Sequence, residues 1–74
     1  MDSDYVLQLV ERYQKVASQQ ERNDLLYQIA FSSQIFTTRE MGQIAERGGK
    51  LSEQQRQLLL GFLEVYFNLD WGGI

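Results

Sequence analysis

Three residue types are missing from this chain: it contains no cysteine, no histidine and no proline. Without Cys and His it lacks the commonest acid–base group, the most reactive nucleophile and the usual ligands of transition metals. The same absence removes disulfides and structural zinc sites, which often stabilise small domains. We therefore expect a protein that is not an enzyme, with no catalytic residue, no metal and no cofactor.

Carboxylates and hydroxyls remain as candidates for chemistry, but neither forms a recognisable catalytic arrangement. The glutamates are mostly spaced on solvent-facing sides of predicted helices or in first helical turns, where they complement the helix dipole. Ser33 and Thr37 have no histidine to activate them. Gly48-Gly49-Lys50 lacks the spacing of a phosphate-binding loop. A binding function is therefore favoured over catalysis.

Long apolar runs and an excess of positive charge are also absent. No uninterrupted apolar run approaches the ~20 residues that a membrane span needs, and Met1-Asp2-Ser3-Asp4 is acidic where a secretory signal would be basic. Ten acidic and seven basic residues give a net charge of −3, which repels phosphate backbones at long range. We expect a cytoplasmic protein that binds no membrane and for which nucleic acid is the less favoured partner.

The residues that are present favour a folded, helical chain. Hydrophobic residues make up 43% and aromatics 12% of the sequence, which is too apolar for a disordered segment. Leu, Gln, Glu and Arg are strong helix formers, and the 74 residues suffice for one domain only. The sequence predicts an all-α fold: a compact three- or four-helix bundle-like single domain over residues 1–74.

Capping residues and apolar periodicity place the helices. Ser18, Thr37 and Ser52 each precede by three positions a Glu or Gln, which is the capping-box pattern that starts a helix. The predicted helices cover about 4–17, 19–33, 38–47 and 53–68, and a short C-terminal tail covers 69–74.

The apolar positions within these helices predict the core. The first two helices carry stripes at three- and four-residue spacing, made of Tyr5, Val6, Leu9, Val10, Tyr13, Val16 and Ala17, and of Leu25, Leu26, Ile29 and Ala30. In the third helix we expect Met41, Ile44 and Ala45 to point inward and Gly42 to allow a close helix approach. The last helix is apolar nearly all round, so it should be covered on more than one side.

The surplus of aromatic and aliphatic residues is the main indication of function. A domain this small cannot easily bury every face of its last helix, so we expect a protein partner, a second copy of the chain or both to cover it. The chain would be a small adaptor, regulator or assembly factor. The predicted partner-binding residues are Tyr27, Phe31, Glu64, Phe67, Leu69, Asp70 and Trp71, with Phe67, Leu69 and Trp71 as anchors and the acidic residues as a polar rim.

A helix-turn-helix DNA-binding regulator is the alternative. Residues 38–60 have its outline, with a short helix, a glycine turn and a second helix. The predicted nucleic-acid-binding residues are Arg47, Lys50, Gln54, Gln55 and Arg56. Against this alternative, Glu53 at the start of the second helix would face phosphates unfavourably.

Overall fold

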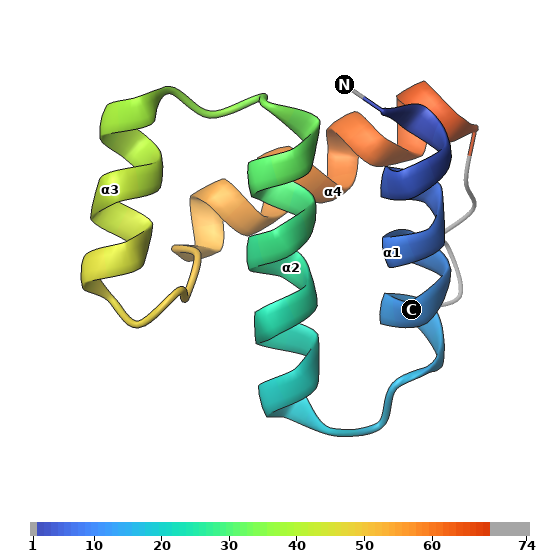
Figure 1. Ribbon diagram of the computed structural model, residues 1–74, viewed down its shortest axis with the longest axis horizontal. Helices are drawn as coiled ribbons and strands as arrows, with labels where there is room; N and C mark the ends of the chain where they lie inside the picture. Colours follow the sequence, from blue (N-terminus) through green and yellow to red (C-terminus); the bar gives the residue numbers. More distant parts are fainter. Residues whose placement is uncertain (1, 69–74) are drawn as a thin grey trace.

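The computed structural model describes residues 2–68, which form four α-helices and no strand (Figure 1). The helices are α1 (Ser3–Lys15), α2 (Gln19–Ser33), α3 (Thr38–Glu46) and α4 (Glu53–Phe67). The predicted all-α fold is confirmed. Each end of a helix lies within two residues of the predicted position.

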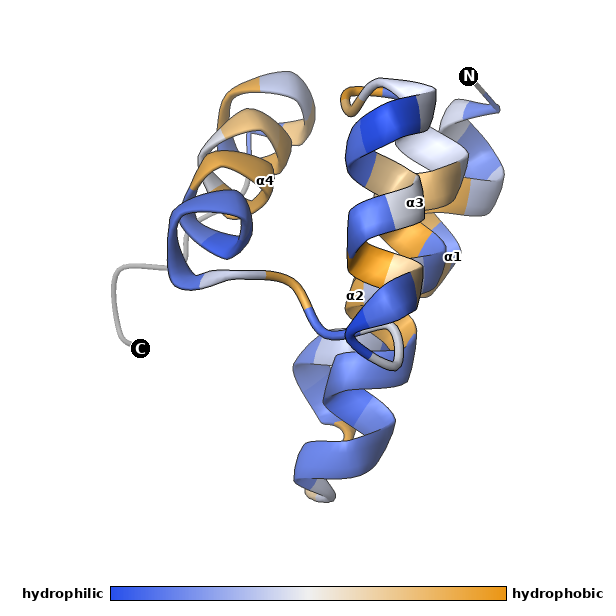
Figure 2. Ribbon diagram, turned by 90° about the vertical axis from the view of Figure 1, so that its left-hand side faces the viewer, coloured by the Kyte–Doolittle hydropathy of each residue, from blue (hydrophilic) through white to orange (hydrophobic). Residues whose placement is uncertain are grey.

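The first three helices form one layer, and the fourth crosses it. In Figure 1, α1, α2 and α3 stand side by side and alternate in direction, while α4 runs across behind them. The view turned by 90° confirms that α4 lies on one side of this layer (Figure 2). One face of the layer is therefore covered by α4, and the opposite face carries no helix among the described residues.

All four helices contribute to a single apolar core. Its buried members are Val6, Leu9, Val10, Leu25, Leu26, Ile29, Ala30, Phe36, Ile44, Leu59 and Leu63. Burial of one aliphatic side chain of this kind stabilises a fold by about 1.5–3 kcal/mol. The predicted stripes of the first two helices supply most of this core, and α4 closes it with Leu59 and Leu63, both fully buried.

Side-chain caps explain where α3 and α4 begin. Thr37 Oγ1 accepts a hydrogen bond from the Glu40 amide at 3.1 Å, and the Glu40 carboxylate accepts one from the Thr37 amide at 3.0 Å. Ser52 and Gln55 form the same reciprocal pair, at 3.1 and 3.0 Å. Each pair satisfies two amides that have no partner inside the helix. Two of the three predicted capping boxes are confirmed, whereas at Ser18 the structure shows only the hydrogen bond from the Glu21 amide and not the reciprocal one.

The prediction for the first helix was wrong in two details. α1 ends at Lys15 and not at Ala17, because Val16 is extended and Ser18 caps α2, accepting from the Glu21 amide at 3.4 Å. A cap residue lies outside helical geometry, so a helix that ran on to Ala17 would leave too little chain for the turn. Tyr5 is 47% exposed and lies at the edge of the apolar stripe.

The prediction for the third helix was also partly wrong. Ile44 is fully buried and Met41 is half-buried, but Ala45 is exposed. The nine residues of α3 contact the core through one narrow side, and Ala45 lies off it. Gly42 permits no close approach, because a Cβ atom added there would meet no atom within 4 Å.

Candidate protein-binding site

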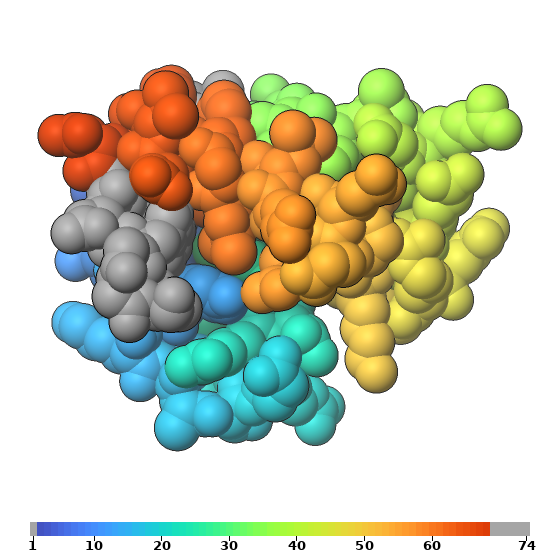
Figure 3. All heavy atoms as spheres, turned by 180° about the vertical axis from the view of Figure 1, so that it is seen from behind, coloured from blue at the N-terminus to red at the C-terminus, as the bar shows by residue number. Residues whose placement is uncertain are grey.

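The outer side of α4 is an exposed apolar surface. Leu58, Gly61 and Val65 are exposed and follow one another at three- and four-residue spacing, so they share one side of a helix with 3.6 residues per turn. The half-buried Phe62 lies next to them, four residues after Leu58. Val65 is 84% exposed and Leu58 is 60% exposed. We call Leu58, Gly61, Phe62, Val65 and Tyr66 the α4 face. In Figure 3 the helix carrying it forms an orange ridge across the surface.

Within the chain the last helix is covered on one side only, so the predicted cover of its other side stays a prediction. Only the side with Leu59 and Leu63 is fully buried, because the layer of α1, α2 and α3 contacts α4 from one direction. A helix that is apolar all round needs cover on its other side as well. Among residues 2–68 nothing supplies that cover to Leu58 and Val65.

Aromatic contacts hold one end of the α4 face in place. The rings of Phe62 and Tyr66 stack with their centroids 5.5 Å apart, and Phe67 meets the Tyr66 ring edge-on at 4.9 Å. The Tyr66 hydroxyl lies 2.9 Å from Ser3 Oγ of α1, within hydrogen-bond distance. Because these contacts restrict the side chains before any partner arrives, binding would cost little side-chain entropy.

Polar side chains border the α4 face without placing a charge inside it. Gln57 and Glu64 are exposed along one border, about one and three helical turns after Glu53 respectively. Arg56, the only cation of α4, lies on another side of the helix and forms an ion pair with Glu53 at 2.6 Å. The face therefore has an apolar centre and a polar border, as interfaces between proteins do.

The structure brings together only part of the predicted partner-binding set. Glu64 lies at the border of the α4 face, whereas Phe67 is half-buried and packs against the core. Leu69, Asp70 and Trp71 lie outside the described residues. The predicted partner-binding set did not include Leu58 and Val65. Their seven-residue separation places them on one side of the helix, but apolar residues surround this helix, so the spacing alone does not single that side out.

Tyr27 and Phe31 belong to a different surface. Phe31 is 67% exposed and lines a hollow of about 330 Å³ together with Tyr5, Tyr27, Gln28 and Ser32. These residues come from α1 and α2, and none comes from α4. The two aromatics therefore do not extend the α4 face.

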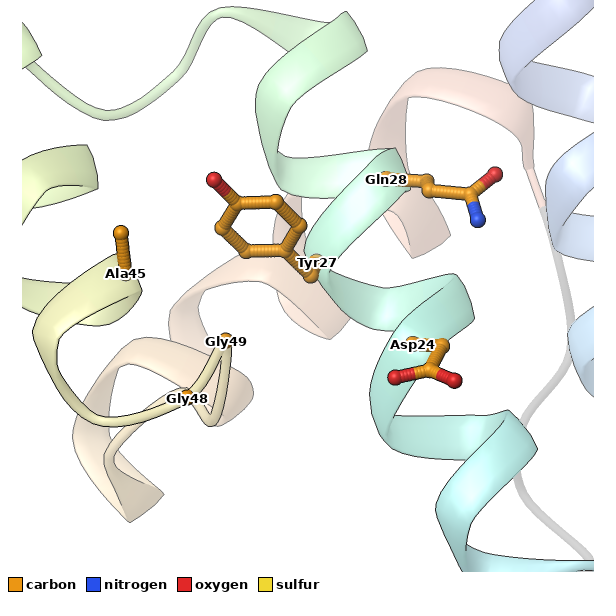
Figure 4. Close-up of a pocket in the computed structure, with 6 residues that line it drawn as sticks. All are labelled: Asp24, Tyr27, Gln28, Ala45, Gly48 and Gly49. Carbon is orange, nitrogen blue, oxygen red and sulfur yellow. The ribbon is translucent and has the colours of Figure 1, made fainter.

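A second hollow lies between α2 and the end of α3 (Figure 4). The Tyr27 ring points toward Ala45 there, while Gln28 points the other way. Gly49 adopts a positive φ of +84°, and a Cβ atom at that position would lie 3.6 Å from Cγ of Tyr27. Asp24 is the only charged residue that lines this hollow, so no set of polar groups converges on a ligand.

Three of the five predicted nucleic-acid-binding side chains make hydrogen bonds within the chain. Arg47 donates to the Lys50 carbonyl at 3.1 Å and to Gln55 Oε1 at 2.6 Å, and Arg56 is bound to Glu53. Lys50 and Gln54 are exposed. Base contacts by Arg47, Gln55 and Arg56 would break or share these bonds. DNA binding stays a prediction.

The pair of Glu53 and Arg56 shifts the pKa of both groups. Hydrogen bonding from Arg56 holds the pKa of the Glu53 carboxyl below its usual value, and the charge of Arg56 acts in the same direction. The hydrogen bond to Glu53 raises the pKa of Arg56. Both shifts favour the charged forms, so at neutral pH both groups are charged and the Arg56 guanidinium stays bound to the Glu53 carboxylate.

Within residues 2–68 no three acidic side chains are grouped so that they could hold a metal ion. None of the helices between residues 3 and 67 is both long and apolar enough to cross a membrane. Comparison of the chain with protein-family models, curated proteins and solved structures gives no match.

Proposed function

We propose that this chain is a non-enzymatic protein–protein interaction module, a small cytoplasmic adaptor, regulator or assembly factor, that binds its partner through the α4 face. The observation that carries the proposal is the exposure of Leu58 and Val65 on one side of α4, at 60% and 84%. Contiguous exposed apolar surface on a folded protein marks interaction sites, whereas single exposed residues are ordinary.

Two further features support the α4 face over the surface around Phe31. The α4 face lies on a regular helix of 15 residues, which presents its side chains in fixed relative positions. Its aromatic residues are also held by stacking and by the Ser3 hydroxyl. Phe31 stacks on no other ring among the described residues.

A pull-down from native lysate of the producing cells tests the proposal. The test variant carries Leu58→Gln and Val65→Gln, which removes apolar surface at two exposed positions while keeping good helix formers. Phe31→Gln is the matched control, because it removes a similarly exposed apolar side chain from the other surface. Circular dichroism checks that each variant folds.

The proposal predicts that a protein retained by the wild type and by Phe31→Gln is lost from the double variant. Loss of apolar contacts at an interface centre costs more than about 1 kcal/mol per anchor residue, which is enough to remove a transient partner. Equal recovery of that protein by the folded double variant, or its loss with Phe31→Gln alone, would refute the α4 face as the binding surface.

A further inference from the structure

Gly61 has no role within the described chain. It lies in the middle of α4 and is exposed, its φ is not positive, and a Cβ atom there would meet no atom within 4 Å. A glycine inside a helix destabilises it by roughly 0.5–1 kcal/mol relative to alanine. Neither backbone conformation nor a neighbouring residue of the fold requires this glycine.

The surroundings of Gly61 differ from those of Gly42, the other mid-helix glycine with open space above it. Gly42 lies beside Arg39 and Glu46 on the exposed side of α3. Gly61 lies between Leu58 and Val65 on the apolar α4 face. A gap in an apolar surface is a place where a side chain from outside can pack.

We infer that the α4 face binds a second copy of the chain, with the two α4 helices antiparallel across a two-fold axis between Gly61 and Phe62. The inference rests on the proposed function and names the partner. In this register Leu58 lies opposite Val65 of the second copy. Phe62 is half-buried against its own core, and the exposed part of its ring packs over Gly61 of the second copy. The surface is self-complementary, as a two-fold interface requires.

Charge and shape both favour the antiparallel arrangement. A parallel pair would bring the two Glu64 carboxylates to the same level and would set Gly61 against Gly61, leaving the gap open. The antiparallel pair places Glu64 near the Gln57 amide of the second copy. A chain with a net charge of −3 can associate with itself here because residues 58, 61, 62, 65 and 66 carry no charge.

The available area fits a weak dimer. Leu58, Val65 and Tyr66 are 60%, 84% and 50% exposed, and Phe62 is half-buried. The exposed parts of these four side chains amount to roughly 400 Å² per copy, on a scale where one large aromatic buries about 150–250 Å². With the polar border, two copies reach the total of about 1,000 Å² that a specific interface needs. We expect a dissociation constant in the range of about 1–100 µM.

Sedimentation velocity between about 1 and 500 µM, spanning that range, tests the inference. Gly61→Gln places a long side chain where Phe62 of the second copy should pack, and Gly42→Gln makes the same change on α3. Both variants gain helix propensity, so neither should unfold. We expect the wild type and Gly42→Gln to dimerise alike, and Gly61→Gln to dimerise at least about 10-fold more weakly.

A wild type that stays monomeric throughout this range, or equal dimerisation of the two glutamine variants, overturns the inference. The pull-down keeps this failure separate from failure of the proposed function. If the wild type is monomeric but retains another protein that the Leu58→Gln, Val65→Gln variant does not retain, the α4 face is the binding surface and its partner is that other protein. If the wild type is monomeric and both chains retain the same proteins, the proposed function and the dimer are both wrong.

Discussion

The hydroxyl oxygens of Ser3 and Tyr66 lie 2.9 Å apart, which joins the first turn of α1 to the last turn of α4. Tyr66 also stacks on Phe62, one turn earlier in α4. The contact therefore connects the start of the described chain to the α4 face. It holds the Tyr66 side chain of the α4 face against the first turn of α1.

Removing this hydrogen bond should lower the stability by a small, measurable amount. We expect Tyr66→Phe to reduce the free energy of unfolding by about 0.5–1.5 kcal/mol, toward the lower end because both groups reach solvent. Ser3→Ala and the double variant complete a cycle of urea-unfolding measurements. Strictly additive effects of the two substitutions would contradict a direct bond between the two hydroxyls.

Ile44 should be the residue that attaches α3 to the rest of the domain. It is the one fully buried side chain of α3. Ile44→Ala should cost about 2–5 kcal/mol in urea unfolding, which approaches the ~3–5 kcal/mol that a core of this size supplies. Ala45→Gln, at the exposed neighbour, should stay within about 0.5 kcal/mol of the wild type. Equal effects at the two positions would contradict the observed orientation of α3.

Alanine should have opposite effects at Gly42 and Gly49. Gly42 is helical with open space above it, so Gly42→Ala should raise the free energy of unfolding by about 0.5–1 kcal/mol. Gly49 has φ at +84°, so Gly49→Ala should lower it by about 1–2 kcal/mol through backbone strain. Thermal melts of the two variants measure the difference. A change of melting temperature with the same sign in both variants would contradict the positive φ of Gly49 in the turn after α3.

The Glu53 carboxyl should titrate at lower pH than an ordinary glutamate. Arg56 stabilises its charged form, so Arg56→Gln should return the pKa of Glu53 toward its usual value. A depressed pKa means that this contribution to stability is present at neutral pH and is lost as the pH falls through the lowered pKa. Carboxyl-carbon NMR follows the titration. An unchanged pKa in the variant would exclude Arg56 as the cause.

Local signals in the sequence were sufficient to place the helices. A cap acts on the amides of its own first turn, so Thr37 and Ser52 mark helix starts whatever the rest of the chain does. The three- and four-residue spacing in the first two helices likewise predicted Val6, Leu9, Leu26 and Ile29 as core residues. Of these two helices only α1 has one clearly apolar side, because the exposed Phe31 places apolar surface on another side of α2.

The exposed side of α4 could not be predicted in the same way. Apolar residues surround that helix, so periodicity selects neither the side with Leu59 nor the side with Val65. The choice depends on how α4 crosses the layer of the other helices, which is a tertiary relationship. The same reason explains why Phe67 was predicted as an anchor although it packs toward the core.

Site-specific photo-crosslinking in the producing cells tests the role of the α4 face most directly. A benzophenone amino acid would replace Val65, and a control chain would carry it at Ala45, an exposed position on α3. The proposed function predicts a discrete crosslinked product from position 65 and none from position 45, with the mass of the product distinguishing a second copy from another protein. No product from position 65, or the same product from both positions, would contradict it.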